Sequence, residues 1–259
     1  MVLVVPEGRD STGGHLPFGV AEILAAVAGA RRVLDAGCGG GRLTVALSRA
    51  GADVTGFDTS RERLEQARRR VETTGVALHL CEADLDLPLP FADASFDAVT
   101  SRLALMVADD PVASLRELRR TLAPGGRVAT VIWASLSANP WFALPREAVG
   151  ATLGADRASF ARAFGELGDP AEAAAVHRVA GLQDVDARLL REHQTAPDAA
   201  AYWQALTEEN GHFRRVTASL NDGERATLAA EVEARLEPYR EGDHLSLPRT
   251  LVLVTARST

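Results

Sequence analysis

Residues 33–41 read Val33-Leu34-Asp35-Ala36-Gly37-Cys38-Gly39-Gly40-Gly41, and residues 42–47 continue as Arg42-Leu43-Thr44-Val45-Ala46-Leu47. An apolar run that ends in a carboxylate, then small residues, then apolar residues three and four positions apart predict a buried strand, a tight turn and a helix. Glycine reaches positive φ and lacks a Cβ, so the backbone of such a turn can approach a ligand. The first N–H groups of the helix favour an anionic group there. The stretch therefore predicts one half of a βαβ unit with a ligand site at its turn.

The spacing of the glycines separates two kinds of ligand-binding turn. A dinucleotide-binding fingerprint would place its third glycine at position 42, where this chain has Arg42. The glycines fall instead at Gly37, Gly39 and Gly41. Because a glycine turn can also serve packing alone, the choice between these uses depends on the rest of the chain.

The composition limits the classes of protein. The chain has 259 residues, of which 46% are hydrophobic, and this favours one large domain with an elaboration. The net charge of -7 argues against nucleic acid as a partner, because such binding depends on basic patches that neutralise phosphates. All 28 basic residues are arginine, so chemistry that needs a lysine amine, such as P-loop phosphate transfer, is excluded. We expect a small-molecule substrate and a monomer or homodimer.

Compartment and metal content follow from two further features. No apolar run approaches the roughly 20 residues of a membrane span. The two cysteines, Cys38 and Cys81, lack the spacing of a zinc site and fit a reducing compartment. We expect a cytoplasmic protein with no membrane partner, no metal and no disulfide.

Strands and helices alternate along much of the chain. The expected strands are residues 33–36, 53–58, 76–81, 96–101, 127–133, 185–191 and 249–255. This alternation predicts an α/β fold, a Rossmann-like doubly wound sheet of seven strands that binds ligands outside the C-terminal ends of its strands. Asp58 ends the second strand about 20 residues past the glycine turn, where a βαβ unit places a carboxylate that accepts hydrogen bonds from ribose hydroxyls. Asp84 follows the third strand at the same edge.

Two stretches interrupt the alternation and predict a helical cap, formed by insertions after strands five and six. The expected organisation is a lid segment and helix at 1–30, a ligand-binding core at 31–134, a cap insertion at 135–170, core again at 171–194, a second cap insertion at 195–246 and the last strand at 247–259. The first segment has a second interpretation, a frayed terminus ahead of a packed helix.

Five short motifs occur in order between about Arg31 and Trp133. They are residues 33–41 as quoted above, Phe57-Asp58, Glu82-Ala83-Asp84-Leu85, Ser95-Phe96-Asp97-Ala98-Val99 and Leu122-Ala123-Pro124-Gly125-Gly126-Arg127. Together they resemble the class I S-adenosylmethionine (SAM)-dependent methyltransferases, in the branch that is similar to the ubiquinone and menaquinone C-methyltransferases. The resemblance implies a Rossmann-like fold, SAM as cofactor and S-adenosylhomocysteine as product.

The resemblance also implies which residues hold the cofactor. They are Asp35 for the ammonium group, Gly37, Gly39 and Gly41 for the methionine part, Asp58 for the ribose with Thr59 next to it, Asp84 and Leu85 for the adenine, and Ser101 beneath the methionine part. SAM suits such a site because it presents a carboxylate to a helix N-terminus, hydroxyls to a carboxylate and a flat ring to apolar surface. Asp35 has a second interpretation as a cap at a strand end.

Catalytic residues are harder to identify than binding residues. A methyl group on a sulfonium is already activated, so the protein has chiefly to align the nucleophile and exclude water, and a base is optional. The histidine that this family often carries in the helix after the fourth strand is absent, and Met106 stands at about that place. The candidate bases are His15 in the leader, then His193, then His212. A lone histidine is equally well explained as a surface or structural residue.

An acceptor pocket is expected from side chains in or beside the insertions. These are Trp133, Trp141, Phe142, Tyr202 and Trp203, together with Met106. Aromatic walls favour a flat, apolar acceptor such as a biosynthetic intermediate. Packing between cap and core explains the same residues equally well.

Three other functions remain open on the sequence. Some relatives on this fold keep SAM as a bound scaffold for a cyclisation or rearrangement, and the absent histidine leaves room for that. A nicotinamide-dependent oxidoreductase shares the βαβ unit with an acidic second strand end, although Arg42 and the turn at 124–126 argue against it. A binding or regulatory module would use the two insertions as interaction surfaces.

Overall fold

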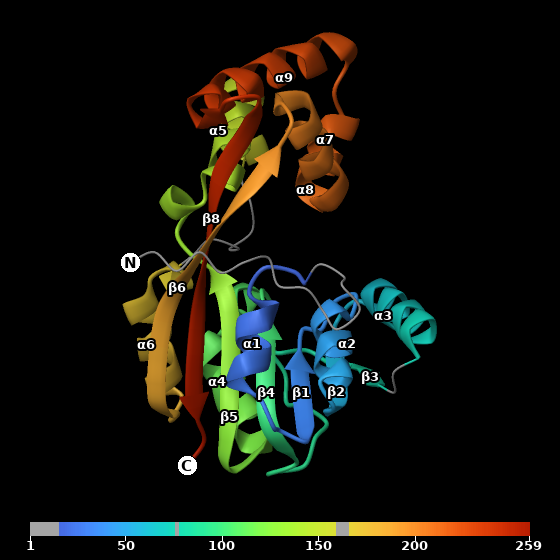
Figure 1. Ribbon diagram of the computed structural model, residues 1–259, viewed down its shortest axis with the longest axis vertical. Coiled ribbons are helices and arrows are strands. Elements are labelled where there is room, and N and C mark those ends of the chain that lie inside the picture. Colours follow the sequence, from blue (N-terminus) through green and yellow to red (C-terminus); the bar gives the residue numbers. More distant parts are fainter. Residues whose placement is uncertain (1–15, 76–77, 159–165) are drawn as a thin grey trace. The chain divides into compact units, whose positions relative to one another are not determined.

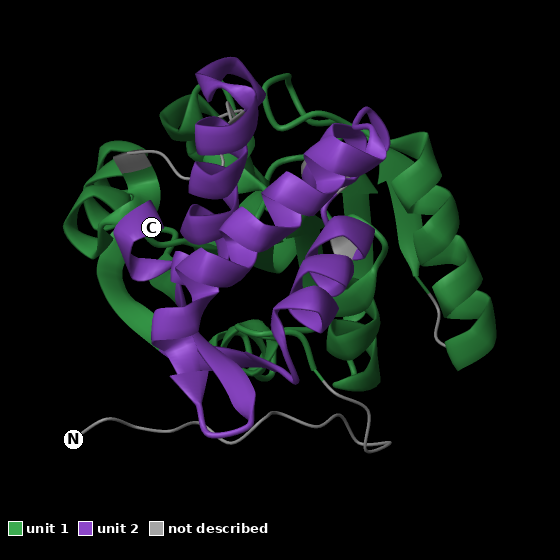
Figure 2. Ribbon diagram, turned by 90° about the horizontal axis from the view of Figure 1, so that it is seen from above, with its two compact units in different colours: residues 1–134, 164–190, 251–259 green, residues 135–163, 191–250 purple. Residues whose placement is uncertain are grey.

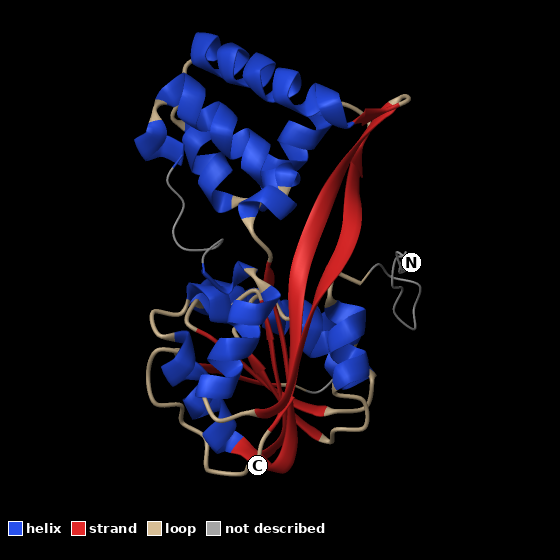
Figure 3. Cartoon of the chain, turned by 90° about the vertical axis from the view of Figure 1, so that its left-hand side faces the viewer, coloured by secondary structure: helices blue, strands red, loops and turns tan. Residues whose placement is uncertain are grey.

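The computed structural model describes residues 16–75, 78–158 and 166–259 (Figure 1). The chain divides into two compact units, of which unit 1 comprises residues 1–134, 164–190 and 251–259 and unit 2 comprises residues 135–163 and 191–250 (Figure 2). Two of the boundaries between the units fall inside long strands, β6 (Gln183–Ala196) and β8 (His244–Arg257), which are among the red arrows of Figure 3. Unit 2 takes in most of the two stretches that interrupt the strand–helix alternation of the sequence.

The strands follow the order β3-β2-β1-β4-β5-β8-β6. Those not yet given are β1 (Arg32–Ala36), β2 (Asp53–Asp58), β3 (His79–Glu82), β4 (Phe96–Arg102) and β5 (Leu122–Trp133). These five pair in parallel, and β8 is antiparallel to β5. The chain order reverses on either side of β1, so β1 and β4 form the switch point at which doubly wound sheets bind ligands. The predicted Rossmann-like, doubly wound fold is confirmed. Among the described residues, the seven expected strands lie on this path and a short eighth strand pairs with β8 beside it.

Several strand bounds differ from the sequence prediction. β5 begins at Leu122 rather than at 127, because Leu122 already pairs with Phe96 ahead of a shift in register. β8 begins at His244, and a short eighth strand, β7 (Arg240–Glu241), pairs with it through a turn in which Gly242 has a φ of 64°. A Gly-Asp pair is typical of such two-residue hairpin turns, so the signal was present in the sequence. Two residues of the expected third strand, 76–77, lie outside the described residues.

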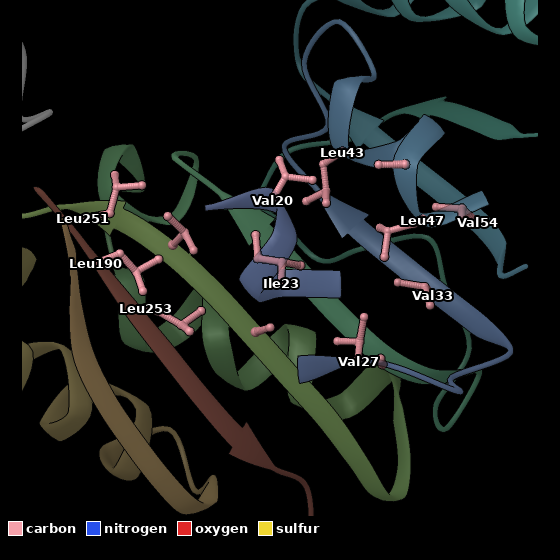
Figure 4. Packing of buried hydrophobic residues seen from close by; sticks show 14 residues of the cluster. Val20, Ile23, Val27, Val33, Leu43, Leu47, Val54, Leu190, Leu251 and Leu253 are labelled. Carbon is pink, nitrogen blue, oxygen red and sulfur yellow. The ribbon is translucent and has the colours of Figure 1, made fainter. Parts of the chain in front are cut away.

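Alternation along β5 assigns the helices of unit 1 to the two faces of the sheet. Ala129 and Val131 pack in one cluster with α1 (Val20–Ala26) and α2 (Arg42–Arg49), whose side chains Figure 4 shows above the strands. Thr130, between them, forms a 2.9 Å hydrogen bond with His177 of α6 (Pro170–Val179). Because successive side chains of a strand point to opposite faces, α1 and α2 cover one face and α6 covers the other.

Two further helices of unit 1 begin at side chains that cap them. Ser60 accepts a hydrogen bond from the Arg63 N–H at 3.3 Å and starts α3 (Arg61–Thr74). Asp110 accepts from two N–H groups of the first turn of α4 (Pro111–Thr121), each at 3.0 Å, and proline occupies the first helical position. Both caps satisfy N–H groups that a helix start would otherwise leave unpaired, so the local sequence fixes where each helix begins after its strand.

Unit 2, which is purple in Figure 2, is mostly helical. Its helices are α5 (Pro140–Leu153), α7 (Ala199–Glu209), α8 (Gly211–Ala218) and α9 (Asp222–Leu236). The buried Asn139 precedes α5, and its Oδ1 accepts from the Trp141 Nε1–H at 3.0 Å and from the Thr250 N–H at 2.9 Å. Its amide also donates to the Thr250 carbonyl at 3.1 Å, which ties the start of α5 to β8.

Candidate functional site

A cavity of about 650 Å³ lies in unit 1 at the C-terminal ends of β1, β2 and β4 and in the loop after β3. Its volume is in the range of small-molecule sites. Of the residues expected to bind the cofactor, seven line it: Asp35, Gly37, Gly39, Asp58, Thr59, Asp84 and Leu85. Because the ends of neighbouring parallel strands meet at one edge of a sheet, residues far apart in sequence converge here.

The three glycines of the turn all have positive φ, at 69° for Gly37, 53° for Gly39 and 78° for Gly41. A Cβ added to Gly37 would lie 2.1 Å from the Ala104 Cβ, and one added to Gly41 would lie 2.9 Å from the Ala67 Cβ. A Cβ added to Gly39 would meet no atom within 4 Å. Gly37 and Gly41 therefore allow close packing, whereas Gly39 leaves open space at the wall of the cavity.

Asp58 joins the end of β2 to the glycine turn. Its side chain is buried, and its Oδ2 accepts from the Gly39 N–H at 3.0 Å while its Oδ1 accepts from the Ser60 N–H at 2.9 Å. The Arg63 guanidinium stands 4.0 Å from the Oδ2. The carboxylate is thus fixed in orientation at the cavity wall by two backbone donors.

Asp35 is fully buried at the end of β1. Its Oδ2 accepts from the Thr44 hydroxyl at 2.7 Å and its Oδ1 from the Thr100 hydroxyl at 3.1 Å. Burial raises the pKa of this carboxyl to about 6, although the two hydroxyl donors and the charge of Arg102 lower it. Ionisation of Asp35 at neutral pH therefore lowers the stability of the folded chain.

Two carboxylates of the loop after β3 accept backbone hydrogen bonds that hold the loop in place. The Asp84 Oδ1 accepts from the Asp86 N–H at 3.0 Å. The Asp86 Oδ1 in turn accepts from the Asp109 N–H at 2.9 Å, next to the start of α4. Asp84, Leu85 and Asp86 all line the cavity, so this loop forms one of its walls.

The cavity also includes residues that the sequence analysis did not single out. They are mainly arginines and residues just past β4: Arg42, Arg63, Arg70, Arg102, Leu103 and Ala104. Arg102 is the last residue of β4, and its Nε–H donates to the Phe18 carbonyl at 3.0 Å. Arg102 follows Thr100 by two positions and therefore shares the sheet face of that residue, but the sequence alone does not show which strand end that face meets.

Two of the expected cofactor residues, Gly41 and Ser101, do not line the cavity, nor does Met106. Gly41 caps the start of α2, and Met106 is half-buried in a 3-10 turn, Leu105–Val107. Ser101 is fully buried, alternates with Thr100 and Arg102, and therefore points to the opposite face of the sheet. Its hydroxyl has no hydrogen-bond partner among residues 16–75, 78–158 and 166–259.

No described histidine lines the cavity of unit 1. His15 lies outside the described residues, and of His212 the structure describes only its place in α8. His193 is exposed on the part of β6 that belongs to unit 2. The buried His177 donates from its Nδ1 to the Ala173 carbonyl at 2.7 Å, and burial lowers its pKa to about 4. That histidine is therefore neutral and structural.

The aromatic residues expected to bind the acceptor lie in two places. In unit 2 the rings of Trp141 and Phe142 are 5.4 Å apart, Phe142 stacks edge-on against Phe213 at 5.5 Å, and Trp203 contacts the same Phe213 at 5.5 Å. Trp141, Phe142 and Tyr202 are buried, so these rings form the core of unit 2. Trp133 belongs to unit 1, where it is half-buried at the end of β5.

Removal of the Tyr202 hydroxyl tests this packing. Tyr202 is fully buried and donates its hydroxyl to the Trp141 carbonyl. We expect Tyr202→Phe to lower the free energy of unfolding by about 1–2 kcal/mol, because the carbonyl loses a buried donor. Urea denaturation measures this. A variant of unchanged stability with altered substrate affinity would instead assign the hydroxyl to the acceptor site.

The described residues show neither a cluster of metal ligands nor a membrane-spanning helix. Among residues 16–75, 78–158 and 166–259, no group of three or more His, Cys, Asp and Glu side chains is placed to hold a metal ion. Within the same ranges, no helix has the length and apolar character needed to cross a membrane.

Known proteins of similar sequence include methyltransferases. The family described as "Methyltransferase domain" matches residues 34–130. The chain is 42% identical over 118 residues to the malonyl-[acyl-carrier protein] O-methyltransferase of Pseudescherichia vulneris, an alignment that covers 44% of this chain and 45% of that protein. It is 42% identical over 101 residues to the ubiquinone/menaquinone biosynthesis C-methyltransferase of Desulfotalea psychrophila. This alignment covers 38% of this chain and 40% of that protein.

A solved structure extends the likeness of fold over nearly the whole chain. A protein of Bacillus halodurans C-125, described as a candidate methyltransferase, matches with a TM-score of 0.63 and 19% identity over 93% of this chain and 99% of its own. The sequence alignments, in contrast, span less than half of the two curated relatives. Residues 34–130 of this chain are thus similar in sequence to the methyltransferase-domain family, and the likeness to the solved structure is one of fold.

Proposed function

We propose that this chain transfers the methyl group of SAM to a small-molecule acceptor. The observation that carries the proposal is the joint placement of Asp58 and the glycine turn, with the Gly39 N–H donating to the Asp58 carboxylate at the wall of the cavity. A carboxylate at the end of β2 suits ribose hydroxyls, and a turn without side chains admits a ligand close to the backbone. The match of residues 34–130 to the methyltransferase-domain family supports the same cofactor.

The residues of the cavity fit SAM in charge and in space. Asp58 is oriented to accept from the ribose hydroxyls, and Asp84 with Leu85 offers an acceptor and an apolar surface to the adenine. Gly39 leaves open space where any other residue would project a Cβ. Asp35 supplies a negative charge for the ammonium group. SAM, when bound, supplies an activated methyl group, so the chain has chiefly to hold the cofactor and the acceptor in line and exclude water.

The acceptor is proposed to be a small biosynthetic intermediate. The negative net charge disfavours nucleic acid, and the two curated relatives are named for methyl transfer to malonyl-[acyl-carrier protein] and for ubiquinone/menaquinone biosynthesis. His15 and His193 stay predictions for the base that a weakly acidic acceptor would need. The aromatic residues Trp133 and Trp203, both half-buried, stay predictions for the acceptor site.

Loss of the Asp58 carboxylate tests the cofactor assignment. We expect Asp58→Ala to weaken SAM binding by about 1.5–3 kcal/mol, which is roughly 10- to 150-fold, because charge-assisted hydrogen bonds to the ribose are lost. Isothermal titration calorimetry with SAM and S-adenosylhomocysteine measures the effect. Asp53→Ala is the matched control, because Asp53 is exposed at the opposite end of the same strand and should leave the affinity unchanged. Equal affinities of the two variants would contradict the ribose role.

The transfer itself is distinguished from its alternatives by the fate of the methyl group. With SAM labelled in the methyl carbon, we expect the label in the product and unlabelled S-adenosylhomocysteine. A rearranged product without label would support a SAM-binding cyclase. An NADH fluorescence change without SAM binding would support the oxidoreductase.

A further inference from the structure

One edge of the sheet is formed by β6. The strand order ends at this strand, which pairs with β8 on one side. Within residues 16–75, 78–158 and 166–259, no other strand pairs with its second side. In Figure 1 the part of β6 in unit 1 lies beyond β8, and Figure 3 views the chain from that side. An edge strand presents a row of backbone N–H and C=O groups, which is a template for pairing with another strand.

The part of β6 in unit 1 contains a stretch, residues 185–189, with the sequence Val-Asp-Ala-Arg-Leu, which we call the edge stretch. Its three apolar residues are half-buried, whereas Asp186 and Arg188 are exposed. The next residue, Leu190, is buried in the cluster that includes residues of α1. Because side chains alternate along a strand, both charged residues lie on the α1 face and the apolar residues lie on the face that α6 covers.

The two charged side chains of the edge stretch are available to a partner. Among the residues that the structure describes, neither Asp186 nor Arg188 has an ion pair or a side-chain hydrogen bond. Asp184, just before the stretch, differs, because its Oδ2 stands 3.9 Å from the Arg257 Nε of β8. The backbone of the stretch has one side-chain contact, in which the exposed Arg178 donates to its first carbonyl at 3.3 Å.

A second copy of the edge stretch complements the first in an antiparallel register. A two-fold axis normal to the sheet at Ala187 places Asp186 opposite Arg188 of the second copy, and the symmetry repeats this pair. On the other face the same axis places Val185 opposite Leu189 of the second copy, again twice. Directly opposite residues of neighbouring strands interact, and pairs of opposite charge stabilise the pairing.

The same charges disfavour the neighbouring registers. Opposite residues share a face of the joined sheet, so the register of two copies changes in steps of two residues. A step in one direction places Asp186 opposite its own copy, and a step in the other direction places Arg188 opposite its own copy. Like charges directly opposite each other are destabilising. The sequence of the edge stretch therefore specifies one pairing with itself.

We propose that the edge stretch of β6 forms a homodimer interface in which the sheets of two copies join edge to edge. The interface is isologous, with Ala187 on the two-fold axis. Pairing of one strand edge buries less surface than a standard stable interface, so we expect a dimer at about 100 μM that dissociates near about 1 μM. None of its residues lines the cavity of unit 1, so SAM should leave the equilibrium unchanged.

Charge reversal tests the register. Asp186→Arg places two arginines opposite each other, and Arg188→Asp places two carboxylates opposite each other. In sedimentation velocity, each variant alone should be monomeric at the concentration at which the wild type is dimeric. An equimolar mixture of the two should recover a dimer, because every arginine then faces a carboxylate. Asp243→Arg is the matched control: it makes the same charge change at an exposed turn beside β7 and should stay dimeric.

A cysteine on the proposed axis gives an independent measurement. Ala187 faces its own copy, and opposite Cα atoms of an antiparallel pair are about 4.5–5.5 Å apart, a distance that a disulfide spans. Ala187→Cys should therefore form an intermolecular disulfide under mild oxidation, seen on a non-reducing gel. Gln183→Cys is the matched control, because the two copies of this exposed residue would be about 26 Å apart along the strands. The wild type, whose cysteines are buried or half-buried, controls for other disulfides.

The outcomes decide the proposal. A wild type that stays monomeric up to about 200 μM overturns it. A dimer that survives both charge reversals uses another surface, which also overturns it, as does equal cross-linking of the two cysteine variants. Circular dichroism checks the fold of each variant. If a charge reversal unfolds the chain, the cysteine pair decides, because its substitutions introduce no charge. Failure of SAM binding would contradict only the proposed function, since the dimer does not depend on it.

Discussion

Replacement of Gly37 by alanine should lower the free energy of unfolding by about 4 kcal/mol. Two costs add at this position, because φ is 69° and the new Cβ would lie 2.1 Å from the Ala104 Cβ. The left-handed conformation costs a non-glycine residue roughly 1–2 kcal/mol, and an extra carbon in a packed place costs about 1–3 kcal/mol. The neighbour is the Cβ of a short side chain that cannot rotate away, so relief requires movement of the backbone past β4. Urea denaturation followed by circular dichroism measures the loss.

Gly39→Ala is the control that separates packing from conformation. Gly39 has a φ of 53°, but its added Cβ would meet nothing within 4 Å. We expect only the conformational cost, about 1 kcal/mol of stability. The same Cβ would project into the space proposed for the cofactor, so SAM affinity should fall while the chain stays folded. Equal stability of the two alanine variants would show that the turn adjusts freely and that Ala104 does not constrain Gly37.

The different roles of these two glycines show where sequence reasoning ends. The spacing of Gly37 and Gly39 in a strand–turn–helix pattern predicts the turn, because the pattern is local. Which glycine is needed for packing depends on Ala104, which reaches the turn from the loop after β4. Arg102 was missed for the same reason, since its place beside Asp35 follows only once β4 is known to pair with β1. Local periodicity predicts elements, whereas contacts between strand ends require the sheet order.

The aromatic residues show a second limit of the sequence. Trp141, Phe142 and Tyr202 are large, amphipathic side chains in the insertions, and such residues are typical both of pockets and of cores. The structure buries all three in unit 2, with ring contacts among them and their neighbours. Composition cannot separate the two uses, because the difference lies in whether the rings face one another or a solvent-accessible space. The doubly wound sheet, in contrast, was predictable because its strand–helix alternation repeats along the sequence.

Replacement of Asp35 by asparagine should both stabilise the fold and lower its affinity for the cofactor. The folded chain raises the pKa of this buried carboxyl from 3.8 to about 6, so it binds the proton more tightly than the unfolded chain does. The contribution of Asp35 to stability therefore falls as the pH rises from about 4 through about 6 and stays low above that. A rise of about 2 pH units corresponds to roughly 2–3 kcal/mol at neutral pH. Asparagine does not ionise, so at pH 8 the variant should be more stable than the wild type by up to this amount. At pH 4 the two proteins should have nearly equal stability.

The same substitution should lower SAM affinity while it raises stability, and the two measurements together decide the role of Asp35. An ionised Asp35 attracts the ammonium group of SAM, so Asp35→Asn should bind SAM at least about 10-fold more weakly at pH 8. Wild-type affinity should decline below pH 6 as Asp35 takes up its proton, and the affinity of the variant should not follow that decline. Thr44→Val keeps the carboxylate but removes the 2.7 Å donor that lowers the pKa of Asp35, so it should destabilise the fold and shift the decline of binding to higher pH without abolishing it. An asparagine variant that is less stable at pH 8 and binds SAM normally would make Asp35 a structural cap. A gain in stability with a loss of affinity would instead show that the chain retains a buried charge against its own stability because the cofactor requires it.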